Sequence, residues 1–136
     1  MTKVRAMLPR LWAGLMAFLF FVNAFSLRFA PTTDMGAPSV QAFTPYLLSL
    51  TNRLSARELA WAALVCLGLW RREFRLVGFL LLMRALIESQ DIATLTLALL
   101  QGQAAPAQLG VVAAVLILVI LHLLAARTLL RQAKAD

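Results

Sequence analysis

Four long apolar blocks divide this sequence, and they leave few folds open to it. The blocks run over residues 11–27, 55–70, 74–100 and 106–126. Hydrophobic residues make up 62% of the chain and charged residues 14%, against about 45–50% and about 25% in ordinary soluble domains. At ~1.5 Å per residue the blocks are suited to crossing an apolar layer of ~30 Å, the second being short and therefore expected to have little tilt. The sequence therefore predicts an all-α, four-transmembrane-helix bundle, with residues 1–136 forming one integral membrane domain.

The basic residues flank the apolar blocks. With four spans, three basic groups fall on one side of the membrane: Lys3, Arg5 and Arg10; Arg71, Arg72 and Arg75; Arg127, Arg131 and Lys134. Cytoplasmic loops carry the excess of Lys and Arg, so we expect a multi-pass protein of the cell inner membrane with both termini in the cytoplasm. The net charge of +7 does not form a basic stripe with interleaved aromatic residues, so no nucleic-acid partner is predicted.

The ends of the first two blocks carry further signals. The first block has the form of a signal peptide, but its apolar run exceeds the usual ~7–15 residues, so we interpret it as a retained span. In the first outer loop, Thr44-Pro45 is typical of a helix start, which predicts a short interfacial helix before the second span. Ser55 and Glu58 then fit a capping box that opens that span.

The third block contains a run of charges. Arg84, Glu88 and Asp91 are spaced i, i+4, i+7 and fall within ~60° of one another on one helix face. Charged side chains in a bilayer usually point into the protein and pair there. Antiparallel pairing of the second and third spans about Glu73 brings Arg57 and Glu58 to the same level. The predicted site is a ligand-binding or buried polar network of Asn23, Arg57, Glu58, Arg84, Glu88 and Asp91.

Two interpretations of this network stay open. It could be a set of ion pairs and hydrogen bonds that fixes helix register, or a ligand, ion or proton site that opens outward. The set holds three acids and two bases, so either Arg28 also pairs with it or one carboxylate is partly protonated. The residues do not decide between these alternatives.

The remaining polar and aromatic residues predict no metal and no cofactor. His122 is placed in the inner third of the fourth span, far from the outer charges, and bonded to a neighbouring helix. A single histidine cannot supply both ligands of a bis-His haem or a zinc site by itself. Cys66 is interpreted as a small buried apolar residue. An aromatic stripe along the first span is expected to face lipid or a partner helix; it contains Phe18, Phe21, Phe25 and Phe29.

A family resemblance rests on two short motifs. Arg57-Glu58-Leu59-Ala60 at the start of the second span, with Arg84 and Asp91 in the third, resembles small four-span bacterial membrane proteins of unknown function, broadly DoxX-like. The likeness covers about Ser55 to Leu100. It implies a compact four-helix bundle in the cytoplasmic membrane and brings no established reaction. The single cysteine departs from any thiol-redox relative.

The sequence assigns no reaction to the chain. It has no Gly-rich phosphate loop, no H-E-x-x-H and no G-x-S-x-G, so no enzyme class is indicated. We expect a structural or accessory subunit, or an interaction protein, whose partners are the lipid bilayer and a membrane protein or further copies of itself. The alternative is a lipid-, quinone- or proton-handling protein with an outward-facing polar site on spans two and three.

Overall fold

The structure, a computed structural model, describes residues 3–29, 45–102 and 108–134, and within these ranges it is all-helical without strands. The elements are α1 (Lys3–Phe29), α3 (Pro45–Trp70), α4 (Phe74–Leu100) and α5 (Leu109–Gln132). The prediction of an all-α chain with four long helices is confirmed for this part of the chain.

The helix boundaries differ from the predicted spans most at α3, which begins ten residues earlier; α1 begins eight residues earlier and α5 ends six residues later. The predicted separate interfacial helix is wrong for the described residues, because a single helix runs from Pro45 to Trp70. Proline is at the first helical position, as expected, and no glycine or proline interrupts the following residues before Gly68. Thr44, which belongs to the same prediction, lies outside the described residues.

The turn between α3 and α4 is short and hydrogen-bonded. The amide of Glu73 donates to the carbonyl of Gly68 (2.8 Å), and the amide of Arg72 donates to that of Leu69 (3.2 Å). Arg72 has a φ of 58°, the left-handed conformation that closes such a Schellman turn. The turn therefore sets α4 antiparallel to α3.

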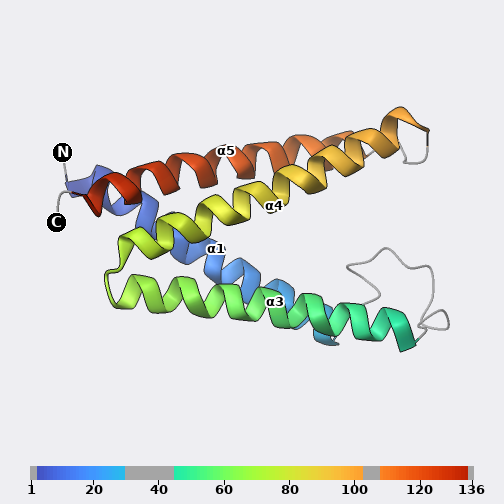
Figure 1. The fold of residues 1–136 in the computed structure, drawn as a ribbon, viewed down its shortest axis with the longest axis horizontal. Helices are drawn as coiled ribbons and strands as arrows, with labels where there is room; N and C mark the ends of the chain where they lie inside the picture. Colours follow the sequence, from blue (N-terminus) through green and yellow to red (C-terminus); the bar gives the residue numbers. More distant parts are fainter. Residues whose placement is uncertain (1–2, 30–44, 103–107, 135–136) are drawn as a thin grey trace.

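The four helices form two closely packed pairs, α1 with α3 and α4 with α5 (Figure 1). The axes of α3 and α4 diverge away from their turn, and α1 crosses from the end of α5 to α3. Both termini and the α3–α4 turn lie at the same end of the molecule. That end, which we call the basic end, carries Arg71, Arg72, Arg131 and Lys134, all exposed.

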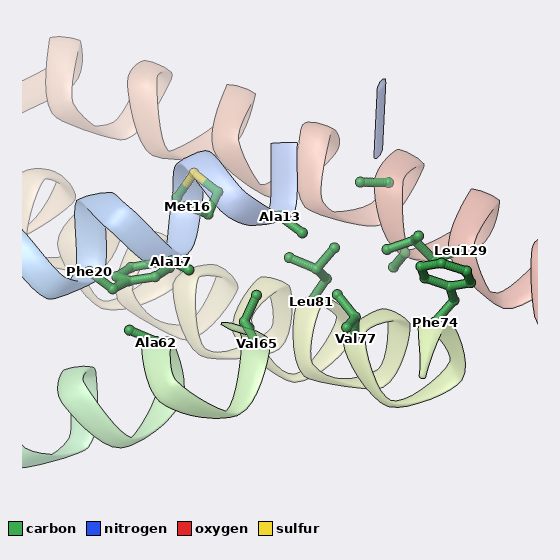
Figure 2. Packing of buried hydrophobic residues seen from close by; sticks show 12 residues of the cluster. Ala13, Met16, Ala17, Phe20, Ala62, Val65, Phe74, Val77, Leu81 and Leu129 are labelled. Atoms are coloured by element: carbon green, nitrogen blue, oxygen red, sulfur yellow. The ribbon is translucent and has the colours of Figure 1, made fainter. Parts of the chain in front are cut away.

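Small side chains allow the helices to approach closely in the core (Figure 2). Ala13 and Ala17 of α1 lie in one buried cluster with Ala62 and Val65 of α3 and Leu81 of α4. Between α4 and α5, a Cβ on Gly78 would lie only 2.8 Å from the Cγ of Leu130. Residues with small side chains therefore determine how closely the helices approach each other at these contacts.

Large apolar side chains instead lie on the outside of all four helices. Examples are Phe18 (62% exposed), Leu86 (62%) and Ile117 (58%). Phe18, Phe21 and Phe25 of the predicted aromatic stripe are exposed. Cys66 is exposed too, so its interpretation as a buried residue is wrong; it lies on the outer face of α3, whose inward positions are Ala62 and Val65.

Two of the helices are long and apolar enough to cross a membrane. These segments are Met7–Ser26 in α1 and Leu109–Gln132 in α5, and most residues of each are not buried inside the protein. α3 and α4 have comparable length, but internal charges interrupt their apolar surface; these are Arg53, Arg57 and Glu58 in α3, and Arg84, Glu88 and Asp91 in α4.

Candidate functional site

The candidate site is centred on the Arg84 side chain of α4, which is 13% exposed. Its Nη1 donates to both carboxylate oxygens of Glu58 on α3, at 3.0 and 3.1 Å. Its Nε donates to Oε1 of Glu88, one turn further along α4, at 3.0 Å. One guanidinium thus joins carboxylates from two helices. Arginine suits this task because its planar group presents several donors in a fixed arrangement.

Glu88 extends the network to α5. Its Oε2 lies 3.1 Å from Nδ1 of His122, whose side chain is fully buried. Neither atom makes a hydrogen bond within the described residues. The contact is therefore electrostatic, and it becomes an ion pair when the imidazole is protonated.

Aromatic rings enclose the charged groups. The guanidinium carbon of Arg84 lies 4.0 Å from the centroid of the Phe20 ring of α1, a cation–π contact. The Phe20 ring meets Trp61 of α3 edge to face at 4.9 Å between centroids. Trp12 of α1 packs against His122 in the same manner at 5.7 Å. Arg84 and Glu88 of α4 together therefore contact α1, α3 and α5.

The structure brings together four of the six predicted site residues: Glu58, Arg84, Glu88 and, at the edge, Arg57. Nη2 of Arg57 donates to Oε1 of Glu58 at 3.1 Å, and its side chain is 52% exposed. Arg57 thus forms the solvent- or headgroup-facing rim of a cluster whose centre is enclosed.

Asn23 and Asp91 lie apart from this cluster, and both are exposed. Asn23 points away from α3 because the adjacent Ala24, about 100° around the helix, is the residue that faces it. Asp91 lies one turn beyond Glu88, where α3 and α4 have diverged further (Figure 1). The side chain of Arg28 lies outside the described residues.

His122 was not predicted to join the site, and its expected position far from the outer charges is wrong. Glu88 lies ~18 Å from the end of α4 at Leu100, and His122 lies ~20 Å from the start of α5 at Leu109, at ~1.5 Å per residue. The two residues therefore share one level of the antiparallel pair. Counting from the α4–α5 connection would have revealed this level from the sequence.

The predicted capping box is also wrong. Ser55 and Glu58 lie in the middle of α3, where the backbone amides are already bonded within the helix. The Ser55 hydroxyl donates instead to the carbonyl oxygen of Ala24 at 2.8 Å and links α3 to α1. Glu58 is 2% exposed and is committed to the two arginines.

The charges of the cluster balance without Asp91. Glu58 and Glu88 face Arg84 inside and Arg57 at the rim, so neither pairing with Arg28 nor a protonated carboxylate is required for neutrality. Among the described residues, no three His, Cys, Asp or Glu side chains are grouped to hold a metal ion. The geometry is that of an internally paired ionic network.

These features define a class: a helical protein with a buried ionic network and two helices apolar enough to cross a membrane. Comparison with known proteins adds no closer assignment, because no family model, curated protein or solved structure matches the chain. The DoxX-like resemblance therefore stays a prediction.

Proposed function

We propose that this chain is a small polytopic membrane protein with a structural role, as an accessory subunit or an interaction protein within the bilayer. In this proposal all four helices cross the membrane, both termini lie in the cytoplasm, and the Arg84 network holds the helices in register. Its partners are the bilayer and another membrane protein or a further copy of the chain.

The distribution of side-chain size supports residence in the bilayer. Buried positions hold many alanines and polar groups such as Glu58, Glu88 and His122 beside larger apolar residues, whereas a long series of leucine, isoleucine and phenylalanine side chains is exposed on all four helices. A protein in water buries its large apolar residues, and a continuous exposed apolar surface marks contact with lipid or protein. Small residues at helix contacts are typical of packing in membranes.

Three of the charges of α3 and α4 are compatible with spanning because they lie between the helices, whereas Arg53, Arg57 and Asp91 are exposed. Glu58, Arg84 and Glu88 pair between the helices, and Arg57 at the rim completes the balance of charge. The outer faces of α3 and α4 keep apolar residues such as Leu64, Phe79 and Leu86. Charged residues within spans face the bundle interior and pair. The paired charges thus lower the overall hydropathy of α3 and α4 without being exposed on their outer faces.

The main support for the proposed structural role is that the Arg84 network contacts all four helices. Arg84 contacts Glu58 and Phe20, and its partner Glu88 contacts His122. Every charge in this centre has a partner inside the chain. An apolar groove lies between α1 and α5, and another hollow lies at the α3–α4 turn; neither is lined by Arg84 or its partners. These features favour a packing role over an outward-facing binding site.

The proposed topology is tested by cysteine accessibility. Cys66 is the single cysteine, so a Cys66→Ser background accepts one new cysteine at a time. In intact cells, a membrane-impermeant maleimide should label Gln101→Cys at the outer end and leave Lys134→Cys unlabelled until the membrane is opened. Labelling of both positions in intact cells, or recovery of the protein in the soluble fraction, would contradict the proposal.

The proposed role is tested by extraction in a mild detergent. Size-exclusion chromatography with light scattering should give a defined complex larger than one 15.0 kDa chain after the detergent mass is subtracted. A Glu88→Gln variant should lose the complex only in proportion to its loss of folded protein. A monodisperse, partner-free monomer would argue against an accessory or interaction role.

A second candidate, proton handling, is favoured by the Glu88–His122 contact. This buried carboxylate–imidazole pair is 3.1 Å apart, and the other ring nitrogen of His122 has no partner among the described residues. A carboxylate and an imidazole can each accept and release a proton. Proton flux into proteoliposomes that disappears in Glu88→Gln and His122→Gln would favour this function, whereas tight vesicles would exclude it.

A further inference from the structure

An apolar groove of about 530 Å³ runs between the first half of α1 and the last half of α5. Its walls are formed by Leu8, Leu11, Trp12 and Leu15 of α1 with Leu121 and Leu124 of α5. Binding sites for small ligands commonly have volumes of ~300–1,000 Å³. The groove extends ~10 Å along each helix, at ~1.5 Å per residue.

The groove changes character toward the basic end. The last residue lining it on α5 is Thr128, whose hydroxyl donates to the carbonyl of Leu124 at 2.8 Å and keeps its lone pairs for accepting. Arg131 follows one turn later, in the last turn of α5, and it is exposed. Arg131 falls within ~20° of Leu124 on the helix surface, so it continues the same side of α5.

An apolar groove that is followed by a cationic side chain is complementary to an anionic lipid, which has an apolar acyl chain and a negatively charged headgroup. The groove would lie along the acyl region of the inner leaflet, and Arg131 would lie at the depth of the headgroups. Basic groups at a cytoplasmic helix end attract anionic headgroups, and pockets between spans bind them specifically. A purely apolar partner helix would gain nothing from Arg131.

We propose that the α1–α5 groove is a binding site for an anionic phospholipid, with one acyl chain between Leu11 and Leu124 and the phosphate at Arg131. The proposal rests on membrane residence as stated under the proposed function, and it goes beyond it by naming a ligand class and its site. The site is separate from the Arg84 network, although Trp12 contacts both the groove and His122.

Trp12 provides a direct probe of the groove. The chain has three tryptophans, so Trp61→Phe with Trp70→Phe leaves Trp12 as the single reporter. In vesicles of phosphatidylcholine, lipids brominated on the acyl chain should quench Trp12 at several-fold lower mole fraction when they carry phosphatidylglycerol headgroups than when they carry phosphatidylcholine headgroups.

Matched variants separate a site from a general attraction to charge. Arg131→Gln should move the phosphatidylglycerol curve onto the phosphatidylcholine curve. Arg71→Gln removes an equal charge from the same end, at the α3–α4 turn, and should leave the difference intact. Equal quenching by both lipids, or an equal loss in both variants, would overturn the proposal.

Native mass spectrometry of the otherwise unmodified chain gives a second measurement that does not need the tryptophan variants. Retained phosphatidylglycerol should decrease several-fold in Leu124→Trp, which fills the groove, and should stay unchanged in Leu123→Trp, an exposed neighbour outside it. Retention that is equal in both variants, or a second copy of the chain cross-linked over the groove, would overturn the site.

Failure of this inference is distinguishable from failure of the proposed function. If the protein floats with vesicles and Trp12 is quenched equally by all lipids, only the lipid site is lost. If the protein does not float and no lipid quenches Trp12, membrane residence itself is contradicted.

Discussion

The Arg84 guanidinium meets two carboxylates and one aromatic ring at the same time. Glu58 and Glu88 both lie 3.0 Å from its nitrogens, and Phe20 lies 4.0 Å below its carbon. Lysine carries one compact charge and could not match both carboxylates in a fixed plane. In a medium of low dielectric constant, the loss of this group leaves two anions without their shared cation.

Replacement of Arg84 by leucine should therefore lower the free energy of unfolding by about 3 kcal/mol, the scale for removing one partner of a buried pair. Unfolding in a titration of mixed detergent micelles with sodium dodecyl sulfate measures this change. Arg53→Leu is the control, because Arg53 is exposed on α3 and its loss should change stability little. Equal stabilities of the two variants would contradict the assigned role of Arg84.

At this scale the sequence predicted part of the site. Charged residues at i and i+4 share a helix face, and the short basic turn fixes the register of α3 against α4, so Glu58, Arg84 and Glu88 were found from spacing alone. The position of Asp91 depends on the divergence of α3 from α4, which no local pattern encodes. The role of His122 depends on the register of α5 against α4, which is set by the α4–α5 connection and not by the spacing of charges within α4.

At the scale of the elements, close contacts at small residues hold each helix pair together. Gly78 of α4 faces Leu130 and the backbone of Ala126 on α5; a Cβ there would lie 2.8 Å from Leu130 Cγ and 3.3 Å from the Ala126 carbonyl oxygen. Gly110 of α5 has nothing within 4 Å of the same position. The two glycines therefore form a matched pair for substitution.

Gly78→Ala should force α4 and α5 apart and lower stability by ~1–3 kcal/mol, as over-packing does. Gly110→Ala should leave stability unchanged or raise it by up to ~1 kcal/mol, because alanine favours helix. Thermal denaturation in detergent, followed by circular dichroism, measures both changes. A stable Gly78→Ala variant would show that the α4–α5 contact is looser than described.

The α1–α3 pair is linked by the hydroxyl of Ser55, which donates to the Ala24 carbonyl at 2.8 Å. Ser55→Ala should cost ~0.6–1.7 kcal/mol, the range for hydrogen bonds between membrane helices. Ser89→Ala removes a hydroxyl whose bond stays within α4, to the Ala85 carbonyl, and it should cost less. The same denaturation experiment compares them, and a reversed order would exclude the proposed link.

The apolar blocks were sufficient to predict the four helices, and the predicted bounds of residues 74–100 agree with α4. The start of α3 was missed because Ser55 and Glu58 fit a cap, yet nothing between Pro45 and Ser55 breaks a helix. A cap motif within a run of helix-compatible residues is a weak boundary signal, since the backbone amides it would serve are bonded within the helix. In the folded protein the Ser55 hydroxyl bonds to α1 and the Glu58 carboxylate bonds to Arg57 and Arg84.

At the scale of the whole molecule, two helix pairs meet across one polar centre, and large apolar residues cover the outside. Composition and block length were sufficient to predict an all-helical chain. The pairing of α1 with α3 and of α4 with α5 (Figure 1) was not predicted, because it depends on which small residues oppose each other. Basic residues gather at one end because the α3–α4 turn and the last turn of α5 both lie there (Figure 1).

The central claim is that the Glu58–Arg84 pair couples α3 to α4 and, through Glu88 and Phe20, to the rest of the bundle. The most direct test is a double-mutant cycle with Glu58→Gln, Arg84→Leu and the double variant, in which the free energy of unfolding is measured for each. The account predicts that the double variant loses at least ~1 kcal/mol less than the sum of the single losses, because the second change removes the anion that the first one stranded. Losses that add to within ~0.3–0.5 kcal/mol, as for independent sites, would contradict it.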